Sequence, residues 1–345
     1  MNILAGEWQL QLSSQAEAAD RLTSWPQKSW QILRDAGLLG LSIPVEHGGL
    51  GRKAVELLDT LEQIATSCLT TAFVLSQREA AIRHLLRGPI ALQRRYLPKL
   101  AAGEDYATVG LSQLTTSRQH LGPTLRVTEL ADGRVQLDGE IPWVTGADQA
   151  AGIVAGGTLA DGRQLLVVIP RDRLDGMIEA PLPLAALVGS RTSLIHCRQL
   201  ILEHEDVLAG PTENVLGKLG GGGLDTSCIA IGLTAAAVKE LRREAERRPE
   251  LSATAERFAA TLADARQRLH GLARATPDPN QTLELRMDCT KLALRSTQAC
   301  LMVSKGNGFV SPHPAQRWAR QALFFLVWSC PKPVSEGVLA DLTNW

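Results

Sequence analysis

The sequence lacks several patterns, and each absence excludes a class of protein. Its six cysteines stand at positions 68, 197, 228, 289, 300 and 330, without Cys-x-x-Cys spacing or a closely spaced pair. Small secreted domains held by disulfides need such pairs, so we expect reduced, mostly buried thiols. No run of about eighteen apolar residues occurs, and the start of the chain has no basic stretch followed by an apolar core. We therefore expect a cytoplasmic protein with no membrane partner.

An excess of charge of either sign is also missing. Lysine plus arginine and aspartate plus glutamate number 36 each in a chain of 345 residues. No overall field favours nucleic acid, and we expect none as a partner. His196 and His204 stand in strand-like sequence, but no set of His, Cys, Asp and Glu has the spacing of a metal site, so we expect no metal.

Three segments with different apolar spacing follow one another along the chain. Residues 1–105 show helical spacing, as in SWQILRDAGLLGL. Residues 106–211 contain short runs rich in Val, Ile and Leu between Asp-Gly turns, which predict strands. Helical spacing returns in residues 212–345. We predict an α+β protein with an N-terminal helical domain, a central β barrel or sandwich and a C-terminal helix bundle.

Several stretches resemble the acyl-CoA dehydrogenase family, in the family's own order. LRDAGLLGLSIPVEHGGLG is similar to the signature of the first domain, and QRRYLPKLAAGE to the segment that leads into the β domain. GEIPWVTGADQA resembles the stretch that lies against the flavin, and Gly189 and Arg191 match a glycine and an arginine of the last strands. The resemblance covers residues 25–342. It implies an acyl-CoA dehydrogenase-like fold, FAD as cofactor, and an acyl thioester or another small molecule as ligand.

The resemblance places candidate flavin contacts in two parts of the chain. Those in the β domain are Val109, Leu111, Ser112, Trp143, Val144 and Thr145. Backbone N–H groups at the pyrimidine edge of the ring stabilise the anion that forms on reduction. Trp143 would cover one face of the ring and Thr145 would offer a hydroxyl near N5; without the resemblance, Trp143 reads as an ordinary core aromatic residue. In the bundle, Lys305 and Gly306 match a glycine-rich family stretch, where a lysine pairs with a phosphate or is solvated.

Other parts that hold the cofactor in the family have changed. Ser117, Arg118 and Gln119 replace its Gly-Ser-Asp, and ERRPELSA replaces the Arg-x-x-Phe-Gly turn that grips the flavin pyrophosphate of a neighbouring subunit. Losing a charge-assisted contact to a phosphate removes about 1.5–3 kcal/mol of binding free energy. We therefore expect FAD to be bound weakly or lost.

The family's catalytic base is missing from both of its known positions. Ser329 stands where many relatives carry a glutamate on the last helix, and Ser227 stands where others carry it on the first bundle helix. Removing a proton α to a thioester needs an acceptor of suitable pKa within reach, and a serine hydroxyl needs a base of its own. The catalytic residue is therefore unknown, and Cys330, Asp225 and Glu336 are the remaining candidates.

Three functions remain open. The first is a flavoenzyme with altered chemistry, in which reduced flavin reacts with oxygen or serves only to transfer electrons. The second is a conventional dehydrogenase of acyl-CoA or acyl-carrier thioesters with a relocated base. The third is a non-catalytic relative that binds or assembles. Flavin content separates the third from the others, and bleaching of the flavin by substrate separates the second from the first.

Two further expectations concern packing. Arg317 and Arg320 keep the family's spacing, and we expect them to form salt bridges within the bundle. The stretches CIAIGLTAAAV and LALRSTQACLMV contain more apolar residues than a helix with one face exposed to solvent requires. We therefore predict a homodimer or homotetramer packed through the C-terminal helices.

Overall fold

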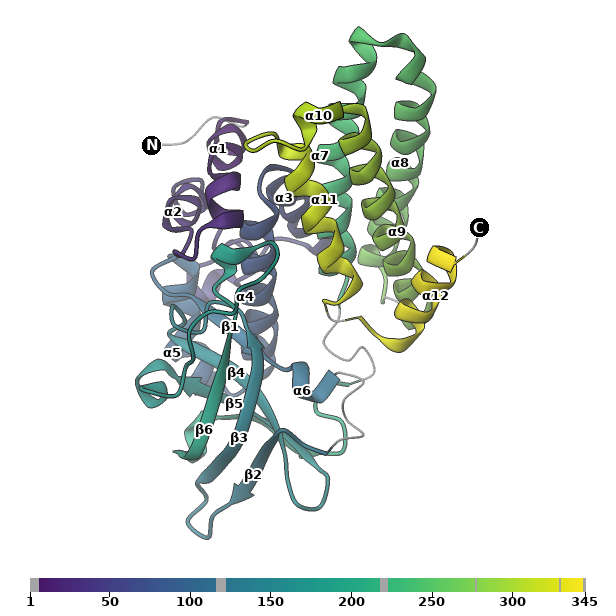
Figure 1. Ribbon diagram of the computed structural model, residues 1–345. Coiled ribbons are helices and arrows are strands. Elements are labelled where there is room, and N and C mark those ends of the chain that lie inside the picture. The colour runs from purple at the N-terminus through teal and green to yellow at the C-terminus, as the bar shows by residue number, and fades with distance from the viewer. Residues whose placement is uncertain (1–5, 116–121, 218–222, 277, 329, 344–345) are drawn as a thin grey trace.

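The computed structural model describes residues 6–115, 122–217, 223–276, 278–328 and 330–343. Helices form both ends of this part of the chain, and a β-sheet lies between them in sequence (Figure 1). The predicted fold class is thereby confirmed: N-terminal helices, a central β part and a C-terminal helix bundle. The division into three domains at residues 106 and 212 stays a prediction.

Within the described residues, five α-helices precede the first strand. They are α1 (Glu7–Arg21), α2 (Gln27–Asp35), α3 (Ala54–Ser67), α4 (Leu69–Arg87) and α5 (Ile90–Ala101). In α3 the buried residues Leu58, Leu61, Ile64 and Ala65 lie on one face, as the helical spacing predicts. Cys68 separates α3 from α4, because its extended backbone at φ −152° and ψ 104° interrupts the helical hydrogen bonds.

A mixed sheet of seven described strands follows. The strands are β1 (Ala107–Gly110), β2 (Leu125–Glu129), β3 (Val135–Val144), β4 (Gly152–Thr158), β5 (Gln164–Pro170), β6 (Ser193–Leu202) and β7 (Val207–Thr212). Their order is β6-β3-β2-β4-β5-β7, with β1 paired to β4. β1 runs parallel to β4, whereas β3 and β6, and β4 and β5, are antiparallel. The short helix α6 (Ser112–Thr115) follows β1.

The strands β4 and β5 are buried at nearly every position, because both faces of the sheet are covered there. Val154 and Val168 pack with Ile82 of α4 and Leu97 of α5. The alternate residues of the same strands belong to the larger core on the other face. A run of apolar residues without alternation therefore marks a strand here.

The C-terminal helices pack around α7. They are α7 (Asp225–Arg247), α8 (Ser252–Arg274), α9 (Pro279–Val303), α10 (Lys305–Gly308), α11 (Pro314–Leu323) and α12 (Lys332–Thr343). α7 contacts α3, α8 and α9. At Gly232 it approaches α3 so closely that a Cβ atom would lie 2.5 Å from the Cβ of Ala65 and 2.6 Å from the carbonyl oxygen of Glu62. Among the described helices, none has the length and apolarity that crossing a bilayer requires.

The apolar start of α7 is covered by the same chain. Cys228, Ile229, Ala230, Ile231 and Leu233 are all buried without a second copy, because α3, α8 and α9 surround this helix. Helices of the same chain account for the excess of apolar residues, so this stretch gives no reason for an oligomer. The homodimer or homotetramer stays a prediction.

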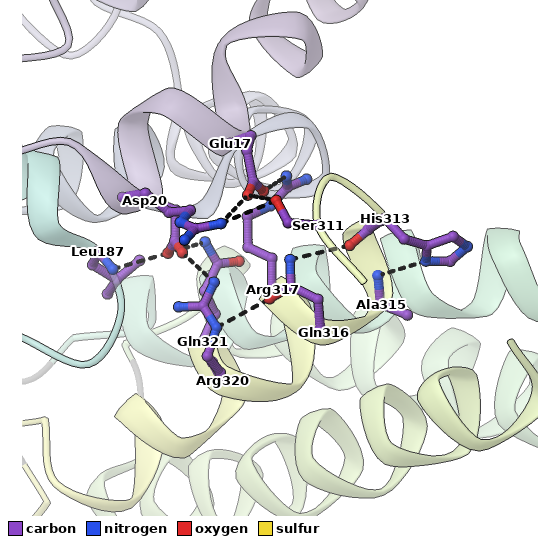
Figure 2. A network of polar contacts seen from close by, with 11 residues as sticks. Glu17, Asp20, Leu187, Ser311, His313, Ala315, Gln316, Arg317, Arg320 and Gln321 are labelled. Atoms are coloured by element: carbon purple, nitrogen blue, oxygen red, sulfur yellow. Dashed lines mark hydrogen bonds and ion pairs between the residues drawn. The ribbon is translucent and has the colours of Figure 1, made fainter. Parts of the chain in front are cut away.

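One buried carboxylate joins three distant segments. Asp20 of α1 is 0% exposed. Its Oδ1 accepts hydrogen bonds from the backbone N–H of Leu187 at 2.9 Å and from Nε2 of Gln321 at 2.8 Å. Its Oδ2 accepts from a guanidinium nitrogen of Arg320 at 2.8 Å (Figure 2). Asp20 thus ties α1 to the loop before β6 and to α11.

A second carboxylate of α1 binds the other arginine of α11. Glu17 lies 2.9 Å from a guanidinium nitrogen of Arg317 and accepts a hydrogen bond from the Ser311 hydroxyl at 2.8 Å (Figure 2). Partial burial raises the pKa of Glu17, but these two donors lower it, and the net pKa lies below its usual value. The expected salt bridges of Arg317 and Arg320 within the bundle were wrong. Both arginines pair with the N-terminal helix instead.

Replacing Asp20 by alanine is expected to lower the free energy of unfolding by about 2–4 kcal/mol, because it leaves the buried Gln321 amide and Leu187 N–H without their acceptor and removes the ion pair with the partly exposed Arg320. Urea denaturation followed by circular dichroism measures the change. Asp132→Ala is the matched control, since Asp132 pairs with Arg134 at the exposed surface. A loss for Asp20→Ala no larger than for this control would contradict the role of Asp20.

Candidate functional site

The first predicted flavin segment lies where β1 ends and α6 begins. It contains Val109, Leu111 and Ser112. The Ser112 hydroxyl donates to the backbone oxygen of Pro142 in β3 at 2.9 Å. β1 also approaches β3 so closely that a Cβ atom at Gly110 would lie 2.4 Å from Cγ2 of Ile141. The corner between β1 and α6 is therefore fixed against the end of β3, where the second predicted segment begins.

Trp143 is exposed, and a β-bulge explains why. Ile141 pairs with Ile195 and Val144 pairs with Ser193. Between these two pairs β3 therefore has one residue more than β6. The extra residue turns Trp143 outward, while Val144 remains buried. Trp143 is 58% exposed and has φ 61°, in the left-handed region that bulky residues avoid. The reading of Trp143 as a core residue is wrong, and a strained, exposed tryptophan is typical of a functional site.

Thr145 belongs to a buried chain of hydroxyl groups. Its Oγ1 lies 3.3 Å from Oγ1 of Thr192, which lies 3.0 Å from the hydroxyl of Ser190. The Tyr106 hydroxyl lies within hydrogen-bond distance of the backbone oxygens of Thr145, at 3.3 Å, and of Val74 in α4, at 3.4 Å. Burial raises the pKa of Tyr106, so its hydroxyl stays a donor. The Thr145 hydroxyl is engaged with Thr192, and its contact with a flavin stays a prediction.

Lys305 and Gly306 do not join this group within one chain. Both residues are exposed and lie in α10, which packs on α9 and α11. In Figure 1, α10 stands at the upper end of the bundle, while the sheet and α6 lie at the lower end of the molecule. The predicted flavin contacts therefore form two separate groups.

The two positions of the family's base differ in what the structure describes. Ser329 lies outside the described residues, as do Ser117, Arg118 and Gln119. Ser227 lies in the first turn of α7, where it is buried and its hydroxyl has no hydrogen-bond partner among the described residues. The adjacent thiol of Cys228 is also buried, and burial raises its pKa well above the usual value. This position offers no group that ionises readily near neutral pH.

The three remaining candidates for a base are engaged or hard to ionise. Asp225 lies 2.6 Å from a guanidinium nitrogen of Arg83. Glu336 faces Lys332 at 3.7 Å on the exposed side of α12. Partial burial raises the pKa of Cys330, so its thiolate is disfavoured. In the described part of the chain, no three His, Cys, Asp or Glu side chains are arranged to hold a metal ion.

Three residues beside these candidates were missed by sequence reasoning. Tyr106 links α4 to Thr145, Phe73 of α4 contacts the rings of the segment after α11, and Arg286 of α9 donates to the backbone oxygen of Trp328 at 2.8 Å. Each contact joins segments far apart in sequence, so spacing within one segment carries no signal for it.

Comparisons with known proteins give a consistent result. The model of the acyl-CoA dehydrogenase N-terminal domain matches residues 9–104. The probable acyl-CoA dehydrogenase YngJ of Bacillus subtilis is 22% identical over 90% of this chain and 88% of its own length. The structure of butyryl-CoA dehydrogenase from Megasphaera elsdenii aligns with a TM-score of 0.85 and 16% identity, covering 99% of this chain and 96% of that one.

A second solved structure contains a reduced flavin. It is a glutaryl-CoA dehydrogenase from Mycobacterium smegmatis in complex with FADH2, with a TM-score of 0.82, 16% identity, and coverage of 97% of this chain and 93% of that one. The fold, the N-terminal domain match and the similarity over most of the chain agree with one another. The chain belongs to the acyl-CoA dehydrogenase family.

Proposed function

We propose that this protein is a FAD-dependent oxidoreductase of the acyl-CoA dehydrogenase type whose chemistry does not use the family's carboxylate base. FAD would supply a two-electron acceptor. Val109, Leu111, Ser112, Trp143, Val144 and Thr145 would hold the ring. The ligand would be an acyl thioester or another small molecule.

The observation that carries the flavin part of the proposal is the exposed, left-handed Trp143. Its position on a bulge places a large aromatic face at the surface without support from the core. The hydrogen bond from Ser112 to Pro142 brings the first predicted segment to the same edge of the sheet. A flat ring could be covered by the indole there and meet backbone N–H groups at the corner between β1 and α6.

The altered chemistry is supported by the residues at the base positions. The sequence has serine at both, and the described one, Ser227, is buried beside a thiol of raised pKa. The carboxylate of Asp225 is paired with Arg83. A serine hydroxyl without a base cannot accept the α-proton of a thioester at a useful rate.

The alternative is a non-catalytic relative that binds or assembles. It is favoured by the changes at the base positions and at the parts that hold the cofactor in the family. Lys305 and Gly306 lie apart from the β-domain group within one chain, and a second copy could present them to a cofactor there. A homodimer or homotetramer would meet that need, and we propose such an assembly in the cytoplasm. A conventional dehydrogenase with a relocated base is the third possibility.

Replacing Trp143 by glycine is expected to weaken FAD binding about tenfold, because the ring loses one aromatic cover. The free energy of unfolding should stay within about 1 kcal/mol of the wild type, since glycine accepts a positive φ and the indole is exposed. Titration of the apoprotein with FAD, followed by visible absorption, measures the affinity. Leu10→Ala removes another exposed apolar side chain and should leave the affinity unchanged. Equal affinity in Trp143→Gly and wild type would argue against this flavin position.

Saturated acyl-CoA thioesters are expected not to bleach the bound flavin under anaerobic conditions. General base assistance typically contributes a factor of about 10² to 10⁴ in rate, and the α-proton would have no acceptor. Stopped-flow absorption of the FAD-loaded protein makes the measurement, and dithionite in a parallel sample shows that the flavin can be reduced. Rapid bleaching by any saturated acyl-CoA would contradict this proposal and show that the protein is a conventional dehydrogenase.

A further inference from the structure

An ion pair joins the two chain segments at the bulged end of β3. Asp148 lies four residues after the end of β3, and Arg191 lies two residues before the start of β6. Nε of Arg191 lies 3.1 Å from Oδ1 and 2.9 Å from Oδ2 of Asp148, and another nitrogen of the guanidinium also donates to Oδ2. The two side chains are only 22% and 24% exposed. A planar guanidinium that contacts both carboxylate oxygens fixes the direction between the two segments as well as their distance.

The guanidinium of Arg191 also reaches a third segment. One of its nitrogens donates to the backbone oxygen of Thr23, which follows α1. Arg191 itself has φ 48°, in the left-handed region that residues with a Cβ atom rarely adopt. Such a conformation persists only where surrounding contacts hold it, and the contacts of this side chain with Asp148 and Thr23 do so.

The ion pair is the outer end of a row of contacts between the two segments. Beyond the last residues that β3 and β6 pair, the hydroxyl oxygens of Thr145 and Thr192 lie 3.3 Å apart. The backbone N–H of Gly146 then donates to the backbone oxygen of Ser190 at 2.9 Å. The ion pair follows these contacts, so it holds the stretch that contains Thr145 against the segment before β6.

This row of contacts lies on one side of the bulge that turns Trp143 outward. On the other side of the bulge, Ile141 pairs with Ile195. A one-residue shift of a strand turns its side chains to the opposite face, so a bulge needs fixed pairing on both sides. The ion pair therefore helps to keep Trp143 exposed in its left-handed conformation at φ 61°.

We propose that Arg191 and Asp148 are positioning residues for the flavin. Their ion pair keeps the indole of Trp143 and the hydroxyl of Thr145 in the arrangement that binds the ring, and neither charged side chain has to touch the cofactor. The inference rests on the proposed function, because it takes Trp143 and Thr145 as flavin contacts. Since the two charged groups act together, loss of either one should have the same effect as loss of both.

A double-mutant cycle on FAD affinity tests this coupling. Titration of the full chain with FAD, followed by visible absorption, would give the Kd for wild type, Asp148→Asn, Arg191→Lys and the double variant. Each single variant is expected to weaken FAD binding about tenfold, and the double variant no more than either single one. Asp148→Asn keeps the shape of the side chain, and Arg191→Lys keeps the charge but loses the planar fork.

Fluorine NMR of the full chain labelled with 5-fluorotryptophan observes the indole itself, without FAD. The resonances of Trp143 and of Trp318 in α11 are assigned by their absence in the corresponding phenylalanine variants. Asp148→Asn is expected to shift or broaden the Trp143 resonance and to leave that of Trp318 unchanged. A general loss of structure would change both.

Asp161→Asn is the matched control. Asp161 lies 2.7 Å from Nε of Arg163 on the turn between β4 and β5, so the same substitution removes an ion pair of the same sheet away from the bulge. It should change neither the Kd of FAD nor the Trp143 resonance.

The outcomes separate this inference from the proposed function. An unchanged Kd in Asp148→Asn, additive losses in the cycle, or a Trp143 resonance that stays in place or moves together with that of Trp318 would overturn the positioning role. Each of these results would leave the proposed function standing as long as the wild type binds FAD. A wild type that binds no FAD would overturn both.

Discussion

The arrangement of the candidate site depends on one buried carboxylate, that of Asp20. Burying an ionised carboxylate is costly unless its oxygens accept hydrogen bonds, and three donors from two other segments surround it. The donors from α11 set the position of the segment that follows, which contains Trp328. The donor from the loop before β6 sets the position of Gly189, where a Cβ atom would lie 2.5 Å from the backbone oxygen of Ala19. Asp20 thus holds α11 and the loop before β6 in place relative to α1.

The fold could be predicted from the sequence, because it depends on local patterns. The spacing of apolar residues follows directly from helix and strand geometry. A short motif also predicted that the stretches around Ser112 and Trp143 meet at one site; the structure brings the Ser112 hydroxyl to Pro142, and their contact with a flavin stays a prediction. Ser227 was placed correctly at the start of a bundle helix.

What could not be predicted depends on contacts between distant segments. The outward turn of Trp143 results from a one-residue bulge against β6, which only the pairing register reveals. The partners of Arg317 and Arg320 lie 300 positions earlier in the chain, in α1. The apolar start of α7 was mistaken for an interface because the sequence does not show that other helices cover it. A central bundle helix and a helix at an interface have the same apolar pattern.

The proposed lack of a catalytic base is tested most directly by hydrogen exchange at the α-carbon of a bound thioester. FAD-loaded protein would be incubated with propionyl-CoA in D₂O, and mass spectrometry of the recovered thioester would count the deuterium gained. The measurement detects proton removal even when no electrons pass to the flavin. We expect deuterium to enter no faster than in buffer alone. Exchange well above the buffer rate would show that a group of this protein takes the proton, and would contradict the assignment of altered chemistry.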